Sequence, residues 1–270
     1  MILWFKKFIF FIRSHQGTID AIIFRELKLK LSKSKFGFLG ILLRQLAQII
    51  LFLLIFTFIR GRIVQGMDPK LFIAIGFITY QIFFEIGFKS SQILNGYSKL
   101  FVYKKIRPFD IIISTTLVSF AFQLIILTII LSLIFVINQE ILLTNLPLLI
   151  ISTIFLVIFS FGFGNIMIVV SSRYTTFSNE ILPLLSRPIF LLSGVILSLD
   201  RIPYNLHKFL TWNPILQAVE LNRHALTNDY FLYDGISLKY LIFTSILVFL
   251  IGMFIHSKNH SYLISKNISG

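Results

Sequence analysis

The sequence predicts an all-α membrane protein with six transmembrane helices, an N-terminal interfacial amphipathic helix, and short re-entrant helices between the fifth and sixth spans. Three observations support this fold class. Hydrophobic residues make up 56% of the 270-residue chain, whereas soluble domains contain about 45–50%. The mean hydropathy is +0.88. The apolar residues also form long runs, and a helix needs roughly 20 of them to cross a hydrocarbon core about 30 Å thick.

The first 35 residues are predicted to be a cytoplasmic segment. Their uninterrupted apolar core, Phe8 to Ile12, is shorter than the roughly 7–15 residues of a signal peptide, so we expect no cleavage. Thr18 is expected to cap a helix with apolar residues on one side and basic residues elsewhere. The apolar positions are Ile19, Ile23, Leu27 and Leu31, and the basic ones are Arg25, Lys28 and Lys35. Such a helix typically lies on a membrane surface, and an ordinary cytosolic helix is the alternative.

Residues 36–256 are predicted to form the transmembrane domain, followed by a cytoplasmic tail at 257–270. The six apolar segments are Phe36–Ile59, Leu71–Ile93, Ile111–Ile137, Ile141–Val170, Ile181–Leu199 and Leu238–Ile255. The fourth segment is too long for a straight span, so we expect it to begin outside the bilayer near Pro147. Gly162 and Gly164 within it permit close helix contact or a bend.

The basic residues between the spans predict the orientation of the chain. With the N-terminus in the cytoplasm, 15 Lys and Arg residues fall on that side and 7 on the outer side. Cytoplasmic loops carry the excess of positive charge in membrane proteins, so both termini are expected to be cytoplasmic. The formal net charge of +14 is thereby explained by topology, and no nucleic-acid partner is expected.

The outer connection from Asp200 to Ser237 is too apolar for a simple solvated linker. We expect two short helices, broken near Asn213 and Pro214, that dip back against the outer leaflet. The region 199–237 is therefore assigned as an extracytoplasmic re-entrant gate region. A small periplasmic cap made of the same helices is the alternative.

Catalytic and metal-binding motifs are absent from the sequence. No phosphate-cradling loop of the Gly-x-x-x-x-Gly-Lys-Ser/Thr type occurs, and no Gly is followed by Lys. There are no cysteines, and the five histidines show no metal-ligand spacing. We therefore expect no catalytic residue, no metal and no cofactor in this chain, and any ATP hydrolysis must belong to a partner subunit.

Polar residues inside the first predicted span indicate a pathway for a polar cargo. Arg44, Gln48, Phe52 and Phe56 recur every four residues and so share one side of a helix. Hydroxyl groups of a sugar chain bind polar side chains, and aromatic faces accept sugar C–H surfaces. In the alternative, Phe52 and Phe56 face lipid and Arg44 reaches toward the inner headgroups.

Two further sets of intramembrane residues are candidates. Arg187 in the fifth segment, with Phe190 after it, is expected to line the same pathway or to pair with Glu180. Glu85 and Lys89 stand four residues apart, which favours a structural ion pair within a helix over a proton relay.

Three stretches of the chain resemble one known family. They are Arg25 to Lys28 running to Gly37 to Gly40; Asn95, Leu100, Tyr103 and Lys105 to Asp110; and Arg187-Pro188, Ser193 to Val195, Ser198 to Asp200, Pro203, Trp212 to Pro214, Ala218 to Glu220 and Arg223. In this order and around six spans, they resemble the permeases of capsular-polysaccharide ABC exporters. These belong to the type-2 ABC transporter permeases, which also include exporters of O-antigen and teichoic acid.

The resemblance implies an assembly and a set of roles. It implies a homodimer, two ATP-binding cassette subunits that hold ATP and Mg, and export of a lipid-linked polysaccharide across the bacterial inner membrane. Periplasmic and outer-membrane export proteins are further implied partners. The ATPase-coupling residues would be Tyr103, Lys104, Lys105, Arg107, Pro108 and Asp110. The outer gate would contain Asp200, Pro203, Trp212, Asn213, Pro214, Glu220 and Arg223. The first and fifth spans would lie at the dimer axis.

Two other classes of function stay open at this point. A type-2 ABC permease for a lipid or a drug would share the topology, but such permeases favour a more uniformly apolar pathway than Arg44, Gln48 and Arg187 suggest. A membrane-embedded transfer enzyme would need a cluster of acids, histidines or metal ligands at a membrane face. The sequence contains no such cluster.

Overall fold

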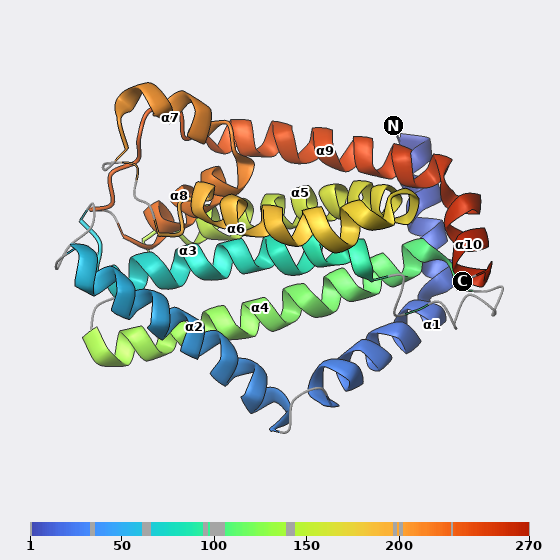
Figure 1. Ribbon diagram of the computed structural model, residues 1–270, viewed down its shortest axis with the longest axis horizontal. Coiled ribbons are helices and arrows are strands. Elements are labelled where there is room, and N and C mark those ends of the chain that lie inside the picture. Colours follow the sequence, from blue (N-terminus) through green and yellow to red (C-terminus); the bar gives the residue numbers. More distant parts are fainter. Residues whose placement is uncertain are drawn as a thin grey trace.

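The chain forms a bundle of helices, and the helices nearest the two chain ends lie at the same end of this bundle (Figure 1). The computed structural model describes residues 2–32, 36–60, 66–93, 97, 106–138, 144–196, 199, 202–227 and 229–269. Within these ranges the elements are helices joined by turns, without a β-strand. Helices α1 and α10 lie at one end of the bundle, and α7 and α8 lie at the other. The predicted all-helical class is confirmed.

Helix α1 (Ile2–Ser32) is continuous through the position where a cap was expected. The prediction that Thr18 begins a helix is wrong, because the residues before it contain no proline and extend the helix toward the N-terminus. The helix packs on α4, where Ile19 and Ile22 are buried and the Ser114 hydroxyl donates to the Ile19 carbonyl at 3.2 Å. Helix α2 (Gly37–Arg60) follows, with its first part inclined by 67° to the end of α1.

Helix α3 (Pro69–Phe83) is the buried centre of the bundle. It begins where the Asp68 carboxylate accepts a hydrogen bond from the Lys70 amide at 2.8 Å. Of its 15 residues, 13 are buried, so the helix is covered on all sides rather than on one stripe. The chain then continues through a single π-helical turn, η1 (Phe84–Phe88), and a 3-10 turn, η2 (Lys89–Gln92).

Helices α4 (Pro108–Asn138), α5 (Leu146–Arg173) and α9 (Leu238–Lys258) complete the long elements. Asn145 caps α5 by accepting from the Leu148 amide at 3.1 Å, so this helix begins beside Pro147, while the position of this start outside the bilayer stays a prediction. Helices α5 and α9 touch through their backbones. A Cβ atom added to Gly252 would lie 2.2 Å from the Gly162 carbonyl oxygen, which confirms that Gly162 serves close helix contact.

The fifth predicted span, Ile181–Leu199, differs most from expectation. After the π-turn η4 (Phe177–Ile181), helix α6 (Leu182–Leu192) has 11 residues and carries Pro188 inside it. A turn follows at Gly194, whose φ of +72° favours glycine. The remaining elements are α7 (Tyr204–Thr211), α8 (Pro214–Leu226) and α10 (His260–Ser269).

Among the residues that the structure describes, four helical segments are long and apolar enough to cross a membrane. They are Pro69–Gln92, Pro108–Val136, Leu146–Arg173 and Leu238–Lys258, and the bent pair of α1 and α2 is a fifth candidate. The predicted number of six spans is therefore not confirmed. Two short helices do form in the 199–237 region, with the expected break before Pro214, while their re-entry into the membrane stays a prediction.

Candidate functional site

Aromatic side chains from three helices meet beside α2. The centre of the Phe190 ring of α6 lies 5.1 Å from the ring centre of Phe52 in α2 and 4.9 Å from that of Tyr80 in α3. Phe77 completes the cluster at 5.9 Å from Phe52. The Tyr80 hydroxyl also donates to the Ser186 carbonyl at 3.0 Å. Two predicted pathway residues, Phe52 and Phe190, are thus brought together, whereas the side chain of Phe56 lies outside the described residues.

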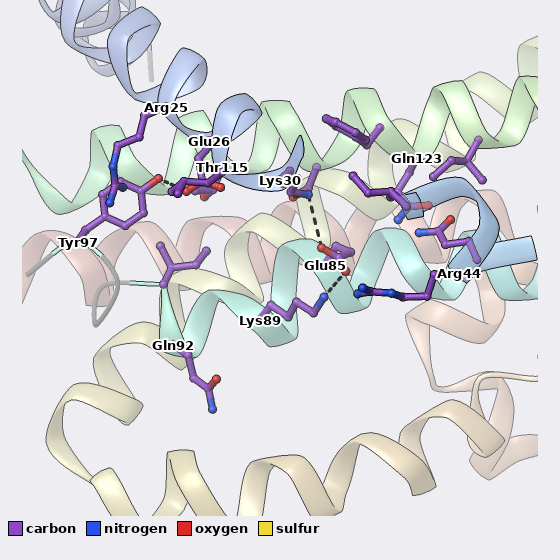
Figure 2. A pocket seen from close by; sticks show the side chains of 17 residues that line it. Arg25, Glu26, Lys30, Arg44, Glu85, Lys89, Gln92, Tyr97, Thr115 and Gln123 are labelled. Atoms are coloured by element: carbon purple, nitrogen blue, oxygen red, sulfur yellow. Dashed lines mark hydrogen bonds and ion pairs between the residues drawn. The ribbon is translucent and has the colours of Figure 1, made fainter. Parts of the chain in front are cut away.

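Arg44 lines a cavity of about 450 Å³ between α1, α2, η1, η2 and α4 (Figure 2). Both Arg44 and Gln48 are exposed on α2, but only Arg44 borders this cavity. Figure 2 shows the Arg44 side chain pointing toward Glu85 and Lys89 on the facing helix. A predicted pathway residue therefore opens into a polar space.

An ion-pair group joins α1 to the π-turn η1 across this cavity. Lys30 of α1 has its Nζ 3.6 Å from a Glu85 oxygen and donates to the Ser119 hydroxyl at 3.0 Å. Glu85 also pairs with Lys89 four residues later, as the structural reading of the sequence predicted. Glu85 lies in the π-turn, and such turns are frequent at functional sites. One carboxylate therefore pairs with two lysines that come from different helical elements.

A second polar group closes the same cavity near its other end. The Arg25 guanidinium lies over the Tyr97 ring, 4.1 Å from its centre, and the Tyr97 hydroxyl donates to Glu26. Burial raises the pKa of Tyr97 far above its ordinary value, with a smaller contribution from Glu26. Tyr97 therefore stays protonated and remains the donor to Glu26.

Arg187 stands apart from these groups. It is exposed on α6 and does not line the cavity that Arg44 borders. The expected pair with Glu180 is not present among the described ion pairs, and Glu180 is itself exposed. Within one copy of the chain, Arg44 and Arg187 therefore do not share a site.

The predicted coupling residues are only partly described. Tyr103, Lys104 and Lys105 lie outside the described residues. Pro108 begins α4, and the Asp110 carboxylate accepts from the Arg107 amide at 3.2 Å, which satisfies a free donor at the helix start. Asp110 is fully buried and lies 3.4 Å from His15 of α1. In this chain Asp110 therefore fixes the start of α4, and Arg107 is exposed.

The predicted outer-gate residues occupy several positions around α7 and α8. Pro203 precedes α7, and Trp212 follows it with a side chain that is 77% exposed. Asn213 accepts from the Ile215 amide at 3.0 Å and donates to the Leu192 carbonyl at 3.2 Å. Asn213 therefore caps α8, which begins at Pro214, and ties it to the end of α6. Asp200 lies outside the described residues.

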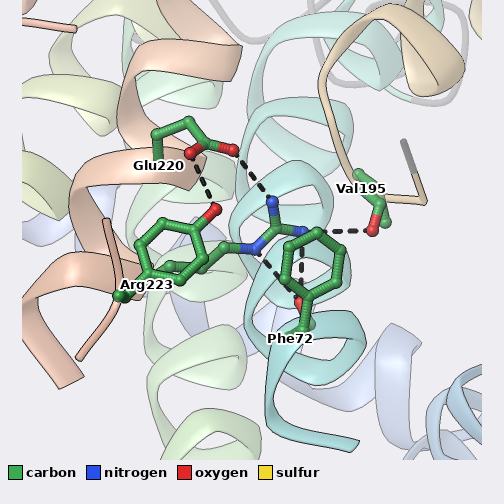
Figure 3. A network of polar contacts seen from close by, with 5 residues as sticks. Phe72, Val195, Glu220 and Arg223 are labelled. Atoms are coloured by element: carbon green, nitrogen blue, oxygen red, sulfur yellow. Dashed lines mark hydrogen bonds and ion pairs between the residues drawn. The ribbon is translucent and has the colours of Figure 1, made fainter. Parts of the chain in front are cut away.

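Glu220 and Arg223 form a fully buried network at this end of the bundle (Figure 3). Arg223 donates to a Glu220 oxygen at 3.0 Å. It also donates to the Phe72 carbonyl and to the Val195 carbonyl, each at 3.1 Å. The Tyr230 hydroxyl donates to the other Glu220 oxygen at 2.7 Å. Burial raises the pKa of Tyr230 well above its ordinary value, so it remains a donor. One side chain thus joins α8, α3 and the turn after α6.

The sequence pattern that defines the ABC-2 type transporter family matches residues 18–227. The chain belongs to this family. The family's pattern therefore extends from Thr18 within α1 to the end of α8 and includes the cavity, the aromatic cluster and the Arg223 network. Together with the long apolar helices, membership makes the chain a multi-pass membrane permease.

Two curated relatives extend the match over nearly the whole chain. Both are Escherichia coli proteins described as polysialic acid transport protein KpsM, and they are 26% and 25% identical to this chain over 249 residues. Each alignment covers 92% of this chain and 96% of the relative. The similarity of this ABC-2 type transporter chain to the two transport proteins therefore extends along most of each chain.

Sequence reasoning missed several residues that border the cavity of this ABC-2 type transporter chain. Lys30, Gln45 and Gln123 were not singled out, although all three line it. A detectable signal existed for Gln123, because it is the single amide in the long apolar run of α4 before Asn138. Lys30 gave no such signal, since it falls among many basic residues of α1.

Proposed function

We propose that this chain is the transmembrane subunit of an ATP-driven exporter that moves a lipid-linked polysaccharide, capsular polysaccharide in particular, across the bacterial inner membrane. The observation that carries the proposal is the match to two polysialic acid transport proteins along 96% of their length. Membership of the ABC-2 type transporter family supports dependence on a separate ATPase. The combination of Arg44 with an aromatic cluster suits a cargo that has hydroxyl groups and sugar faces.

In the proposed assembly, two copies of the chain form the membrane part and two ATPase subunits bind ATP and Mg. Large apolar side chains lie exposed on the two helices that would face the second copy. These are Leu43, Ile50, Leu51 and Leu54 on α2, and Leu184, Leu185, Leu191 and Leu192 on α6. A second copy or lipid must cover them. Both termini lie on the cytoplasmic side in this arrangement.

The proposed mechanism begins when ATP binding closes the partner subunits. The segment from Leu100 to Asp110 moves α3 and α4, and α2 and α6 then part to admit the glycan. Arg44 and Arg187, from different copies or at different heights, guide acidic or phosphate groups. The rings of Phe52 and Phe190 let sugar faces slide past, because an aromatic ring contacts the C–H surface of a sugar without a directional bond that fixes it in one position.

The first test is recovery of the ATPase partner. We would purify the tagged chain in mild detergent from its host, identify co-purifying proteins by mass spectrometry and measure ATP hydrolysis. The triple charge reversal Lys104→Glu, Lys105→Glu and Arg107→Glu should remove the ATPase subunit. A matched reversal at three exposed lysines predicted to face outward, Lys70, Lys208 and Lys239, should leave it bound. A stable chain without any ATPase would contradict the proposal.

The second test concerns the cargo and its pathway. Deletion of the chain should abolish surface polysaccharide and leave the polymer in the cytoplasm, and re-expression should restore export. Arg44→Lys and Phe52→Ala should each slow export at normal expression levels. If both variants export at the original rate, the proposed pathway is wrong. If deletion leaves surface polysaccharide intact, the proposed cargo is wrong.

A further inference from the structure

The cavity beside Arg44 carries more positive than negative charge. Its lining includes four cationic side chains, Arg25, Lys30, Arg44 and Lys89, and two carboxylates, Glu26 and Glu85. Charged groups at membrane depth are costly unless they face a partner or a wet cavity. The excess of two positive charges therefore favours an anionic occupant.

Both carboxylates of the cavity are already engaged by the protein. Glu85 is held between Lys30 and Lys89, and Glu26 accepts the hydroxyl of Tyr97. Arg44 makes no ion pair within the described part of the chain, and its guanidinium points into the space (Figure 2). A planar guanidinium presents several donors that match the oxygens of a phosphate group.

Two buried glutamines border the same space from opposite helices. Gln45 of α2 is 9% exposed and Gln123 of α4 is 2% exposed. The Oε1 atom of each is buried without a hydrogen-bond partner among the described residues. A buried amide oxygen without a donor destabilises the fold, and such atoms are rare in native proteins. Each carbonyl oxygen can therefore accept a hydrogen bond from a hydroxyl group of an occupant, or from water when the cavity holds no occupant.

We propose that this cavity binds a phosphate ester that carries free hydroxyl groups. The phosphate pairs with Arg44 and with the excess charge of the lysines, and the hydroxyl groups donate to Gln45 and Gln123. A volume of about 450 Å³ suits a headgroup or a sugar phosphate, since ligand sites commonly measure about 300–1,000 Å³. The ester comes either from a membrane phospholipid or from a soluble sugar phosphate. The proposed site follows from its lining residues and does not depend on which cargo the chain exports.

The test measures binding to the purified full-length chain, kept with any ATPase subunit that co-purifies. Three probes are titrated by calorimetry below their micelle-forming concentrations: dihexanoyl phosphatidylglycerol, glycerol phosphate and dihexanoyl phosphatidylcholine. Phosphatidylglycerol should bind saturably, and phosphatidylcholine should bind at least about tenfold more weakly because it has no headgroup hydroxyl and carries a cation. Binding of the lipid form alone identifies a membrane headgroup, and equal binding of glycerol phosphate identifies a soluble ester.

Variants separate recognition from folding. Arg44→Gln and Gln123→Leu should each weaken binding about tenfold. Lys208→Gln, which removes an exposed cation on α7, should leave it unchanged. Gln123→Leu replaces an amide whose oxygen is unpaired, so the empty protein should unfold at the same temperature or a higher one. A lower unfolding temperature for this variant would give Gln123 a structural role instead.

Two results would overturn the proposal. The first is the absence of saturable binding for all three probes. The second is binding of phosphatidylcholine as tight as that of phosphatidylglycerol with no change in Arg44→Gln. Because the measurement uses no export assay, it fails or succeeds separately from the polysaccharide test.

Discussion

Replacement of Arg223 by methionine should destabilise the chain strongly. The side chain is fully buried and donates to Glu220, to the Phe72 carbonyl and to the Val195 carbonyl. Its guanidinium also lies 3.4 Å from the centre of the Phe72 ring. Arg223→Met removes the guanidinium that pairs with the fully buried Glu220 carboxylate. Breaking a buried ion pair in this way costs about 3–5 kcal/mol.

The assay is thermal unfolding of the purified chain in detergent, supported by denaturant titration. A loss of 1 kcal/mol lowers the midpoint by about 2–4 °C in a chain of this size, so the expected fall is about 6–20 °C. The double variant Arg223→Met, Glu220→Gln should recover about 2 kcal/mol, because the buried negative charge is gone while Tyr230 keeps an acceptor. The control Arg187→Met removes an exposed arginine and should change stability by less than about 0.5 kcal/mol. The reasoning fails if Arg223→Met unfolds like the control, or if the double variant is no more stable than the single one.

Three further predictions use the same unfolding assay. Gly162→Ala should cost about 1–3 kcal/mol of folding stability because the new Cβ would lie 2.5 Å from the backbone of α9. The control Gly17→Ala has open space around it and should be neutral or stabilising. Equal effects of the two substitutions would contradict the close packing. Tyr80→Phe should cost about 1 kcal/mol by removing the 3.0 Å bond to a main-chain carbonyl of α6; no loss would mean that water replaces it. Burial lowers the pKa of His260, so the folded chain binds this proton more weakly than the unfolded chain, and stability that is complete above the ordinary pKa of about 6.5 is lost as the pH falls. His260→Gln should therefore lessen the loss of stability on acidification, and an unchanged pH profile would refute this.

The sequence predicted the helical class and most of the long helices because long runs of apolar residues can be found without knowing any tertiary contact. The start of α5 beside Pro147 and the break before Pro214 were also predictable, since proline and a preceding asparagine are strong local signals. The fifth predicted span was not confirmed, and proline and glycine are again the local signals that bear on it. Pro188 and the positive φ at Gly194 interrupt a segment whose hydropathy alone looked continuous.

Tertiary partners were harder to predict than helices. Arg223 was assigned to an outer gate from resemblance, and the structure gives it bonds to Phe72, about 150 positions earlier in the chain. No local pattern reveals such a partner. Gln45 and Gln123 likewise matter because two helices bring them to one cavity. The site residues predicted from the sequence therefore stay predictions, although Phe52 and Phe190 do lie together.

The contact between α5 and α9 limits how this chain can change over evolutionary time. What an added methyl group meets at Gly162 or Gly252 is main chain, at 2.2 to 2.6 Å, rather than a side chain. A substitution there cannot be rescued by shrinking the residue opposite, because the obstacle has no side chain to lose. The leucines and isoleucines on the exposed faces of the same helices can be substituted one at a time. The two glycines can be exchanged only if the helices themselves move apart.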